Sequence, residues 1–185
     1  MLKKMLSLLL AVLLLTGTMP ALGESEDVPF GAFSAENIMP MPVEEEGEAE
    51  ANPAPITEAI FAEAELTLVN YWATWCPPCI AELPALGHLN EATEGRAQVV
   101  GVLMDAVDEY GRLDESVIED ALLLMETSEA SYPVLLPDAW LMMIASIVTA
   151  FPTSFLVDSE GNVLVGVVGG RTEAQWLEII EEYLP

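Results

Sequence analysis

Residues 68–79 read LVNYWATWCPPC, a stretch that joins a buried strand to the start of a helix. The run 66–72 is apolar and rich in β-forming residues, which predicts a strand buried within a sheet. Pro77 predicts a helix start, because the N–H that proline lacks would have no partner in a first helical turn. Cys76 and Cys79 therefore lie where the strand gives way to the helix, and they are the only cysteines of the chain.

This lone Cys-x-x-Cys pair limits the chemistry that is available. The chain lacks the second cysteine pair of a four-thiolate zinc site and the several bridges of a disulfide scaffold. A dithiol that can close on itself remains, which indicates redox chemistry. A purely structural disulfide is one alternative. A metal site with His88 as third ligand is another, but His88 follows Cys79 by nine residues on the same helix, too far along the axis to share an ion.

The position of the pair predicts a division of labour between the two cysteines. Unpaired N–H groups and the positive end of the helix dipole favour a thiolate in the first turn. Such a setting can lower a cysteine pKa from about 8.5 to between about 3.5 and 7.5. We therefore expect Cys76 to attack a disulfide of a partner, and Cys79, one turn further along, to resolve the mixed disulfide.

The rest of the sequence alternates strands and helices. Strands are predicted at residues 98–104, 153–157 and 162–168, with a short extended piece at 132–136. Helices are predicted at 114–126, at 139–147 and after Thr172, whose capping-box partner is Gln175. Residues 158–162 carry hairpin turn chemistry. Parallel strands joined by helices and followed by a hairpin predict an α/β fold, with a central mixed β-sheet flanked by helices.

Three regions are expected along the chain. Residues 1–23 combine a basic start, a short apolar run and small residues at Ala21 and Gly23, which predicts a signal peptide cleaved after Gly23. An uncleaved anchor is the alternative, although the apolar run is shorter than the roughly 20 residues of a membrane span. Residues 24–55 are predicted to be an acidic, Pro-rich segment or linker, and residues 56–185 the folded domain. The protein is thus expected to be exported, as a secreted or cell-envelope protein.

The negative charge of the chain excludes some classes of partner. The formal net charge is −26, from 5 basic and 31 acidic residues. Removal of residues 1–23 takes away two basic residues and no acidic one, so 3 basic residues remain against 31 acidic ones, a net charge of −28. Such a surface repels phosphate, so nucleic acid is not an expected partner. No cofactor and no metal are expected, and the protein is expected to be a monomer.

Several motifs resemble one protein family. The stretch 68–79 resembles the active-site strand and helix start of the TlpA/ResA-like branch of the thioredoxin superfamily. Glu82-Leu83-Pro84 continues the likeness, as do residues 151–158, which read FPTSFLVD, with Gly161 and Gly169-Gly170 beyond them. The likeness covers roughly residues 56–184, and residues 30–38 resemble the extra N-terminal strand of that branch. It implies a thioredoxin-like fold with an N-terminal extension.

The resemblance also implies which residues contact a substrate. Pro152 matches the cis-proline that faces the dithiol and offers backbone to a bound peptide. Phe151, Trp75 and Pro77 are expected to border the same docking surface. Ile80 departs from the family pattern, in which the residue after the second cysteine is commonly basic, and it makes the rim of this site more apolar.

Two polar residues receive roles from the same resemblance. Glu82 matches a family glutamate that helps proton transfer to or from the cysteines, and a solvated helix charge is the alternative. Asn70 occupies the place where thioredoxin has a buried acid, and it is expected to form local hydrogen bonds near the site.

Together these features predict an exported thiol–disulfide oxidoreductase that reduces protein disulfides through a mixed disulfide. A membrane thiol carrier is its expected electron donor. The residues between the cysteines do not fix the reduction potential, so the direction of electron flow stays open. A thiol peroxidase is one alternative, although its Thr-x-x-Cys context matches poorly because Thr74 stands two residues before Cys76. A non-catalytic metal-binding module is the other alternative. The methionines of the chain suggest it, but methionine is more often a core residue.

Overall fold

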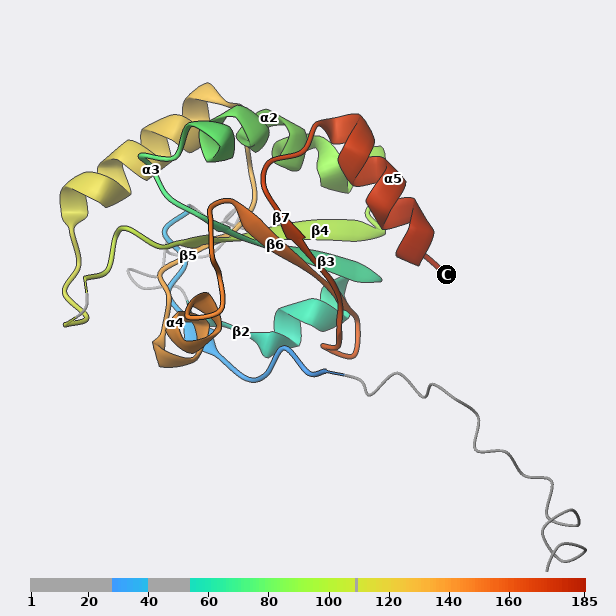
Figure 1. Cartoon of the computed structure of the whole chain (residues 1–185), viewed down its shortest axis with the longest axis horizontal. Helices are drawn as coiled ribbons and strands as arrows, with labels where there is room; N and C mark the ends of the chain where they lie inside the picture. The colour runs from blue at the N-terminus through green and yellow to red at the C-terminus, as the bar shows by residue number, and fades with distance from the viewer. Residues whose placement is uncertain (1–27, 40–53, 109) are drawn as a thin grey trace, which may run out of the picture.

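The computed structural model describes residues 28–39, 54–108 and 110–185 (Figure 1). The predicted signal peptide and most of the predicted acidic linker lie outside these residues. Within them, no helix has the length and apolar character that crossing a bilayer requires.

A five-stranded mixed sheet forms the centre of the fold, as the sequence predicts. Its strand order is β5-β4-β3-β6-β7. The central strand β3 pairs in parallel with β4 and antiparallel with β6, while β5 joins β4 in parallel and β7 joins β6 as a hairpin. The strand bounds are Leu66–Trp72 (β3), Ala97–Leu103 (β4), Val134–Leu135 (β5), Thr153–Asp158 (β6) and Val163–Val168 (β7). Because β3 lies in the middle, every one of its residues is buried.

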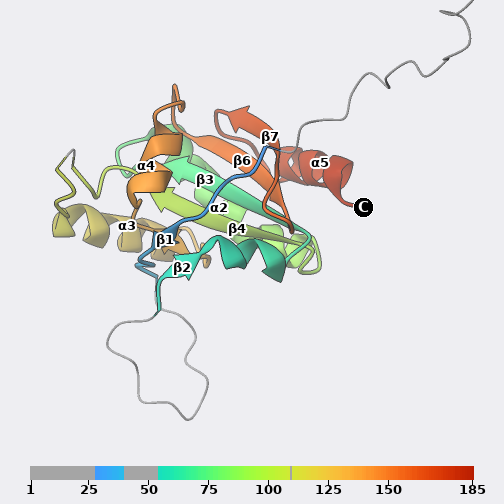
Figure 2. The same ribbon diagram turned by 90° about the horizontal axis from the view of Figure 1, so that it is seen from below.

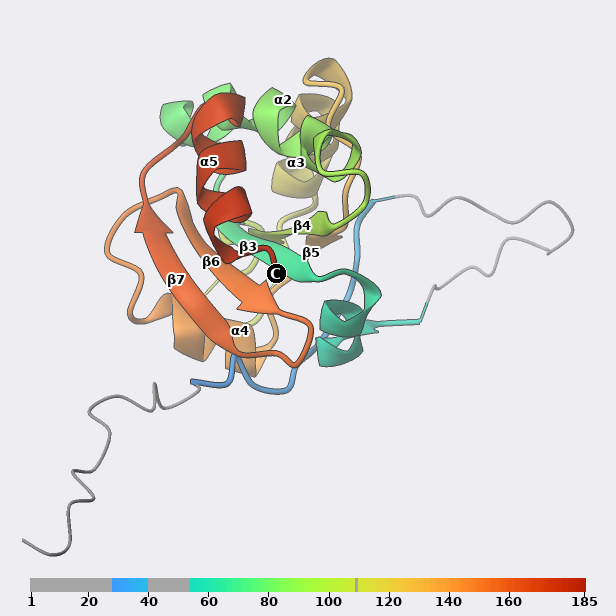
Figure 3. The ribbon, with the colours of Figure 1, turned by 90° about the vertical axis from the view of Figure 1, so that its right-hand side faces the viewer.

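Helices cover both faces of this sheet. Three of them lie on one face: α2 (Pro77–Ala92), α3 (Glu115–Thr127) and α5 (Glu173–Tyr183), seen at the top of Figure 1. The short helix α4 (Ala139–Ala145) and the 3-10 helix η1 (Glu58–Glu63) lie on the other face (Figure 3). Alternate side chains of β3 enter the two cores, since successive strand residues point to opposite faces. Leu68 packs with α2 and α5, whereas Tyr71 packs on the opposite side.

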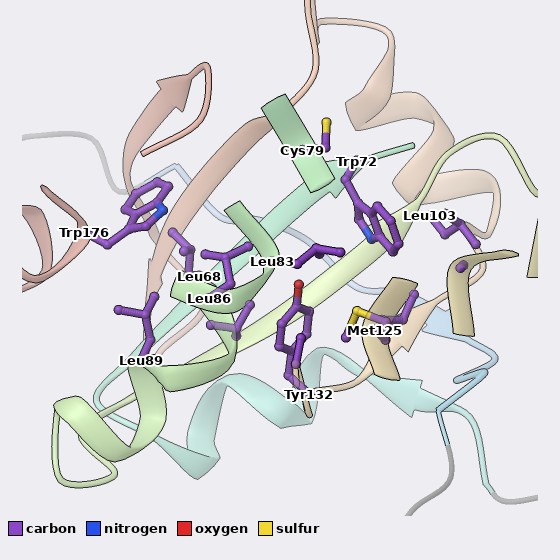
Figure 4. Packing of buried hydrophobic residues seen from close by; sticks show 14 of the residues in the cluster. Leu68, Trp72, Cys79, Leu83, Leu86, Leu89, Leu103, Met125, Tyr132 and Trp176 are labelled. Carbon is purple, nitrogen blue, oxygen red and sulfur yellow. The ribbon is translucent and has the colours of Figure 1, made fainter. Parts of the chain in front are cut away.

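The core on the α2 face reaches the cysteine pair. Figure 4 shows Cys79 at one end of this core, next to Trp72, with Leu83 deeper in. Trp72, Leu83 and the other core leucines of α2 are fully buried. Each such side chain contributes about 1.5–3 kcal/mol when it leaves water. The start of α2, which carries the cysteines, is therefore anchored by fully buried side chains of this core.

Most predicted elements are confirmed, with small shifts at their ends. The predicted strand 66–72 matches β3, and Thr172 caps α5 in a capping box with Gln175. Asp114 is the N-cap of α3 rather than its first residue, since its side chain accepts the N–H of Ser116. The predicted helix at 139–147 ends at Ala145, and within the extended piece at 132–136 the regular strand is limited to β5. The helix η1 and the strand β2 (Ile56–Thr57) had no counterpart in the sequence-based expectations.

Residues 28–39 pack against the folded body. The extra strand expected at 30–38 is reduced to β1 (Ser34–Ala35), which pairs antiparallel with β2. A further bridge joins Asn37 to Leu135 at the edge of the sheet. Phe30 and Phe33 are buried, because their rings pack edge-on against Phe61. Figure 2 shows this segment, in blue, crossing the face of the sheet that carries α4.

Candidate active site

Cys76 and Cys79 are joined as a disulfide at the start of α2. Their sulfur atoms are 2.08 Å apart and their Cα atoms 5.3 Å apart. Cys76 is the N-cap of the helix, and its Sγ accepts the backbone N–H of Cys79 at 3.3 Å. Both residues are buried. The predicted position of Cys76 at the strand–helix boundary is therefore the observed one, with a helix N–H directed at its sulfur.

Exposed apolar residues surround the buried disulfide. Pro77 and Pro78 are exposed in the first turn of α2, and Trp75 is 66% exposed just before it. The ring of Trp75 meets that of Phe151 edge-on, with 6.0 Å between centroids. The rim that the sequence predicts from Trp75, Pro77 and Phe151 is thus brought together. Its large exposed indole is the kind of group that binds a partner's apolar surface.

The peptide bond between Phe151 and Pro152 is cis, as the resemblance implies. The carbonyl of Pro152 already accepts the N–H of Gly169 at 2.8 Å, and proline has no N–H to donate. Within the described residues, the backbone N–H and C=O of Phe151 have no hydrogen-bond partner. The preceding residue, rather than Pro152 itself, therefore has backbone groups to offer at this turn.

Glu82 is buried, so it is not the solvated helix charge that the sequence left open. One carboxylate oxygen, Oε1, accepts the backbone N–H of Arg171 at 2.9 Å and the indole N–H of Trp176 at 2.6 Å. Burial raises the pKa of this carboxyl above its usual range, and the two hydrogen bonds oppose that rise. The nearby Asn70 amide also lowers the pKa of this carboxyl, although no hydrogen bond to Oε2 meets ordinary geometry within the described residues. Glu82 lies three residues, or about one helical turn, beyond Cys79 on α2.

Glu82 also forms part of the wall of a surface pocket. The pocket has a volume of about 540 Å³ and lies between α2 and the loop before α5, bordered by Pro78, Gly170 and Arg171. At its border the chain passes close to α2, since a Cβ on Gly170 would lie 3.1 Å from the carbonyl oxygen of Pro78.

Asn70 forms a local hydrogen bond, as expected. It lies on β3 opposite Ser154 of β6, and its Nδ2 donates to the hydroxyl of Ser154 at 2.9 Å. The amide is buried and satisfies a polar group inside the sheet.

Two features of the site were missed by sequence reasoning. Trp176 of α5, to which the sequence assigned no part in the site, donates its indole N–H to Glu82. Asp105 accepts two hydrogen bonds from Thr74, in the turn just before Cys76. A signal for Asp105 existed, because it follows the predicted strand 98–104, and the carboxyl ends of parallel neighbours meet at one edge of a sheet.

No metal site emerges in the part of the chain that the structure describes. No group of three His, Cys, Asp or Glu side chains there could hold an ion. His88 is exposed and lies 3.4 Å from Glu173 across to α5. The two cysteines are bonded to each other.

A closed cysteine pair at a helix N-cap, a cis-proline just before β6 and this sheet order define a class: a thioredoxin-fold thiol–disulfide oxidoreductase. Residues 35–176 match the Redoxin family, and the chain belongs to it. It is 27% identical over 120 residues to the sporulation thiol-disulfide oxidoreductase A of Bacillus subtilis, which covers 65% of this chain and 69% of that protein. It is 30% identical over 116 residues to the thiol-disulfide oxidoreductase ResA of Bacillus thuringiensis, covering 63% of this chain and 60% of that one.

Solved structures support the same fold. A thioredoxin-family thiol:disulfide interchange protein from Chlorobium tepidum superimposes with a TM-score of 0.65 at 24% identity, over 88% of this chain and all of that one. StoA from Bacillus subtilis superimposes with a TM-score of 0.55 at 24% identity, over 82% and 97% of the two chains. These likenesses confirm the predicted thioredoxin-like fold.

Proposed function

We propose that this protein is an exported reductant of protein disulfides, in which Cys76 attacks and Cys79 resolves. The observation that carries the proposal is the Cys76 sulfur at the N-cap of α2, where it receives the N–H of Cys79. A thiolate in this position gains from the helix N-terminus, which lowers the pKa of the thiol and raises the fraction ready to react.

The reaction has two exchange steps. The thiolate of reduced Cys76 attacks one sulfur of the partner's disulfide, whose S–S bond breaks, and the released sulfur takes up a proton. Cys79 then loses its proton, and its thiolate attacks the Cys76 sulfur of the mixed disulfide. The partner leaves with both sulfurs reduced, and the Cys76–Cys79 disulfide re-forms. Glu82, with a raised pKa and an unpaired oxygen, is the group assigned to take the proton of Cys79.

The substrate would bind across the exposed rim. Trp75, Pro77 and Phe151 supply apolar contact, with Pro152 holding the turn that carries Phe151. The backbone N–H and C=O of Phe151 would pair with an extended peptide beside its disulfide. Such pairing is independent of sequence, so the rim accepts a protein disulfide as a class.

Export and recharging complete the proposal. Residues 1–23 would direct the chain across a membrane and be removed after Gly23, with residues 24–55 ahead of a catalytic domain at 56–185. Each turnover leaves the pair oxidised, so two electrons must return to it, and a membrane thiol carrier would supply them to a monomer. The relatives whose names state thiol–disulfide exchange support this class of partner.

Reduction of insulin by the protein, recharged with a small dithiol, tests the proposal. We expect Cys76→Ser to abolish the activity above the background of the dithiol. Retained activity in that variant would contradict it. The reduction potential of the pair decides the direction of electron flow. A value near about −270 mV fits a reductant, whereas a value near about −120 mV fits an oxidant and would overturn the proposed direction.

A further inference from the structure

The turn between β3 and α2 is held by a side chain from the neighbouring strand. β3 and β4 run parallel, with Trp72 opposite Leu103, so the segments that follow them leave the sheet side by side. Thr74 donates its backbone N–H at 3.0 Å and its hydroxyl at 2.6 Å to the same oxygen, Oδ2, of Asp105. Thr74 stands two residues before Cys76, and Asp105 two residues beyond the end of β4.

The turn that contains Thr74 is short and is closed by a hydrogen bond of its own. The N–H of Cys76 donates to the carbonyl of Ala73 at 3.2 Å, so Thr74 and Trp75 lie inside one turn. Trp75 projects outward and is 66% exposed, and its ring meets that of Phe151 edge-on at the surface. Hydrogen bonds to a carboxylate are roughly twice as strong as neutral ones. The two bonds to Asp105 are therefore a main constraint on where this turn sits.

The carboxylate of Asp105 is directed at this turn. Within the described residues, Thr74 is its only hydrogen-bond donor, and Oδ1 is buried without a partner. A buried carboxylate oxygen without a partner is costly, so the presence of Asp105 behind this turn calls for a reason. The hold on Thr74 supplies one.

We propose that Asp105 is a positioning residue of the thiol–disulfide exchange reaction: it holds Thr74, and so fixes the turn that presents Trp75 and the sulfur of Cys76 at the start of α2. The inference rests on the proposed function and assigns this residue a part in it. When the hold is lost, the sulfur moves relative to the helix N–H groups that stabilise its thiolate, and the thiolate reacts more slowly.

The negative charge of Asp105 and its hydrogen bonds to Thr74 have opposite effects on the reaction rate of Cys76. A carboxylate near Cys76 disfavours a second negative charge, so removal of that charge alone would favour the thiolate and speed its reaction. Removal of the hold slows the reaction. The sign of the change in rate therefore separates the two effects.

The test is the rate of Cys76 alkylation by iodoacetamide in the reduced protein, followed by peptide mass spectrometry across a pH series. We expect Asp105→Ala to slow alkylation about tenfold at neutral pH, and Thr74→Val, which loses the hydroxyl bond but keeps the carboxylate, to slow it about threefold. In Thr74→Val the midpoint of the pH profile should move upward. Thr74→Ser keeps both donors and should react like the unchanged protein.

Asp114→Ala is the matched control. Asp114 accepts the N–H of Ser116 at 3.1 Å and its hydroxyl at 2.6 Å, the same pair of bonds, at the start of α3. This variant should lose stability yet alkylate within about twofold of the unchanged protein, because a helix cap is worth about 1 kcal/mol of stability and Asp114 does not contact the turn.

Two results would overturn the proposal. One is alkylation of Asp105→Ala at the unchanged rate or faster, and the other is an equal slowing in Asp114→Ala. If Asp105→Ala does not fold, Thr74→Val and Thr74→Ser decide: equal rates for these two variants would overturn the proposal. Alkylation needs no partner protein, so its outcome stays readable even if the unchanged protein fails to reduce insulin.

Discussion

Among the single residues of the site, Glu82 makes the stability of the fold depend on pH, because its carboxyl is buried. Its carboxyl is buried against Trp176 and the backbone of Arg171, and burial raises its pKa above the usual 4.5. A carboxyl with a raised pKa holds its proton more tightly in the folded state than in the unfolded chain. Stability from this group is therefore fully present below pH 4.5 and is lost as the pH rises through the raised pKa.

This pH dependence of stability leads to a prediction for Glu82→Gln. The glutamine keeps an oxygen for Arg171 and Trp176 but cannot ionise. We expect the unfolding free energy of the unchanged protein to fall relative to that of Glu82→Gln as the pH rises from 4 to 8. Urea unfolding of the oxidised proteins at several pH values measures it. Glu91→Gln, at an exposed position on the same helix, is the control for loss of a carboxylate. If the difference in unfolding free energy between Glu82→Gln and the unchanged protein is constant with pH, the buried charge does not act as argued.

The sequence predicted the site residues unevenly. Cys76, Cys79 and Pro152 stand in contiguous motifs, so their positions follow from local pattern and from family resemblance. The contacts of Glu82 with Trp176 and of Thr74 with Asp105 join residues 94 and 31 positions apart. Such contacts depend on the register of strands and on how helices cross, which a local pattern does not encode.

At the level of elements, the N-terminal segment packs closely against α4, and Gly31 lies at the contact. Gly31 has a φ of +92°, and the indole N–H of Trp140 in α4 donates to the carbonyl of Phe30 at 2.8 Å beside it. A Cβ at position 31 would overlap the Trp140 ring. The segment can therefore lie against α4 only with glycine at this position.

We expect Gly31→Ala to lower the unfolding free energy by about 2–4 kcal/mol, through left-handed backbone strain plus the overlap with Trp140. Gly95→Ala is the matched control: Gly95 has a φ of +79° with nothing within 4 Å of the added Cβ, so it carries the strain alone, about 1 kcal/mol. Chemical denaturation compares them. Equal losses in the two variants would mean that the segment does not need its close approach to α4.

The elements that the sequence predicted are those with long, regular patterns. The strand β3 and the helices α2 and α5 have apolar runs or caps that specify them locally. β1 and β2 are two residues long and exist through pairing with each other, and η1 is a single short 3-10 stretch. Their formation depends on Phe30, Phe33 and Phe61 meeting, which is a tertiary event.

For the whole molecule, charge is the dominant surface property. The described part contains three arginines, and each is engaged: Arg96 with Glu65, Arg112 with Asp108, and Arg171 with backbone carbonyls. The 31 acidic residues of the chain are therefore mostly uncompensated. A field of this sign attracts cationic partners and repels anionic ones over a range set by the salt concentration.

This field predicts opposite salt effects for two matched substrates. A disulfide peptide flanked by lysines should be reduced more slowly as NaCl rises from 20 to 300 mM, by up to about tenfold, because screening removes the attraction. The same peptide flanked by glutamates should be reduced faster. Stopped-flow measurement of the bimolecular rate constants tests this, and an identical salt dependence for both peptides would show that the overall charge does not act at the dithiol.

Trapping the mixed disulfide shows directly which cysteine attacks, since Cys76 is proposed to attack and Cys79 to resolve. Reduced Cys79→Ser and reduced Cys76→Ser are each mixed with a protein disulfide and mapped by mass spectrometry. We expect a stable adduct through Cys76 in Cys79→Ser and little adduct in Cys76→Ser. Equal adducts in both variants, or adducts mainly through Cys79, would contradict it.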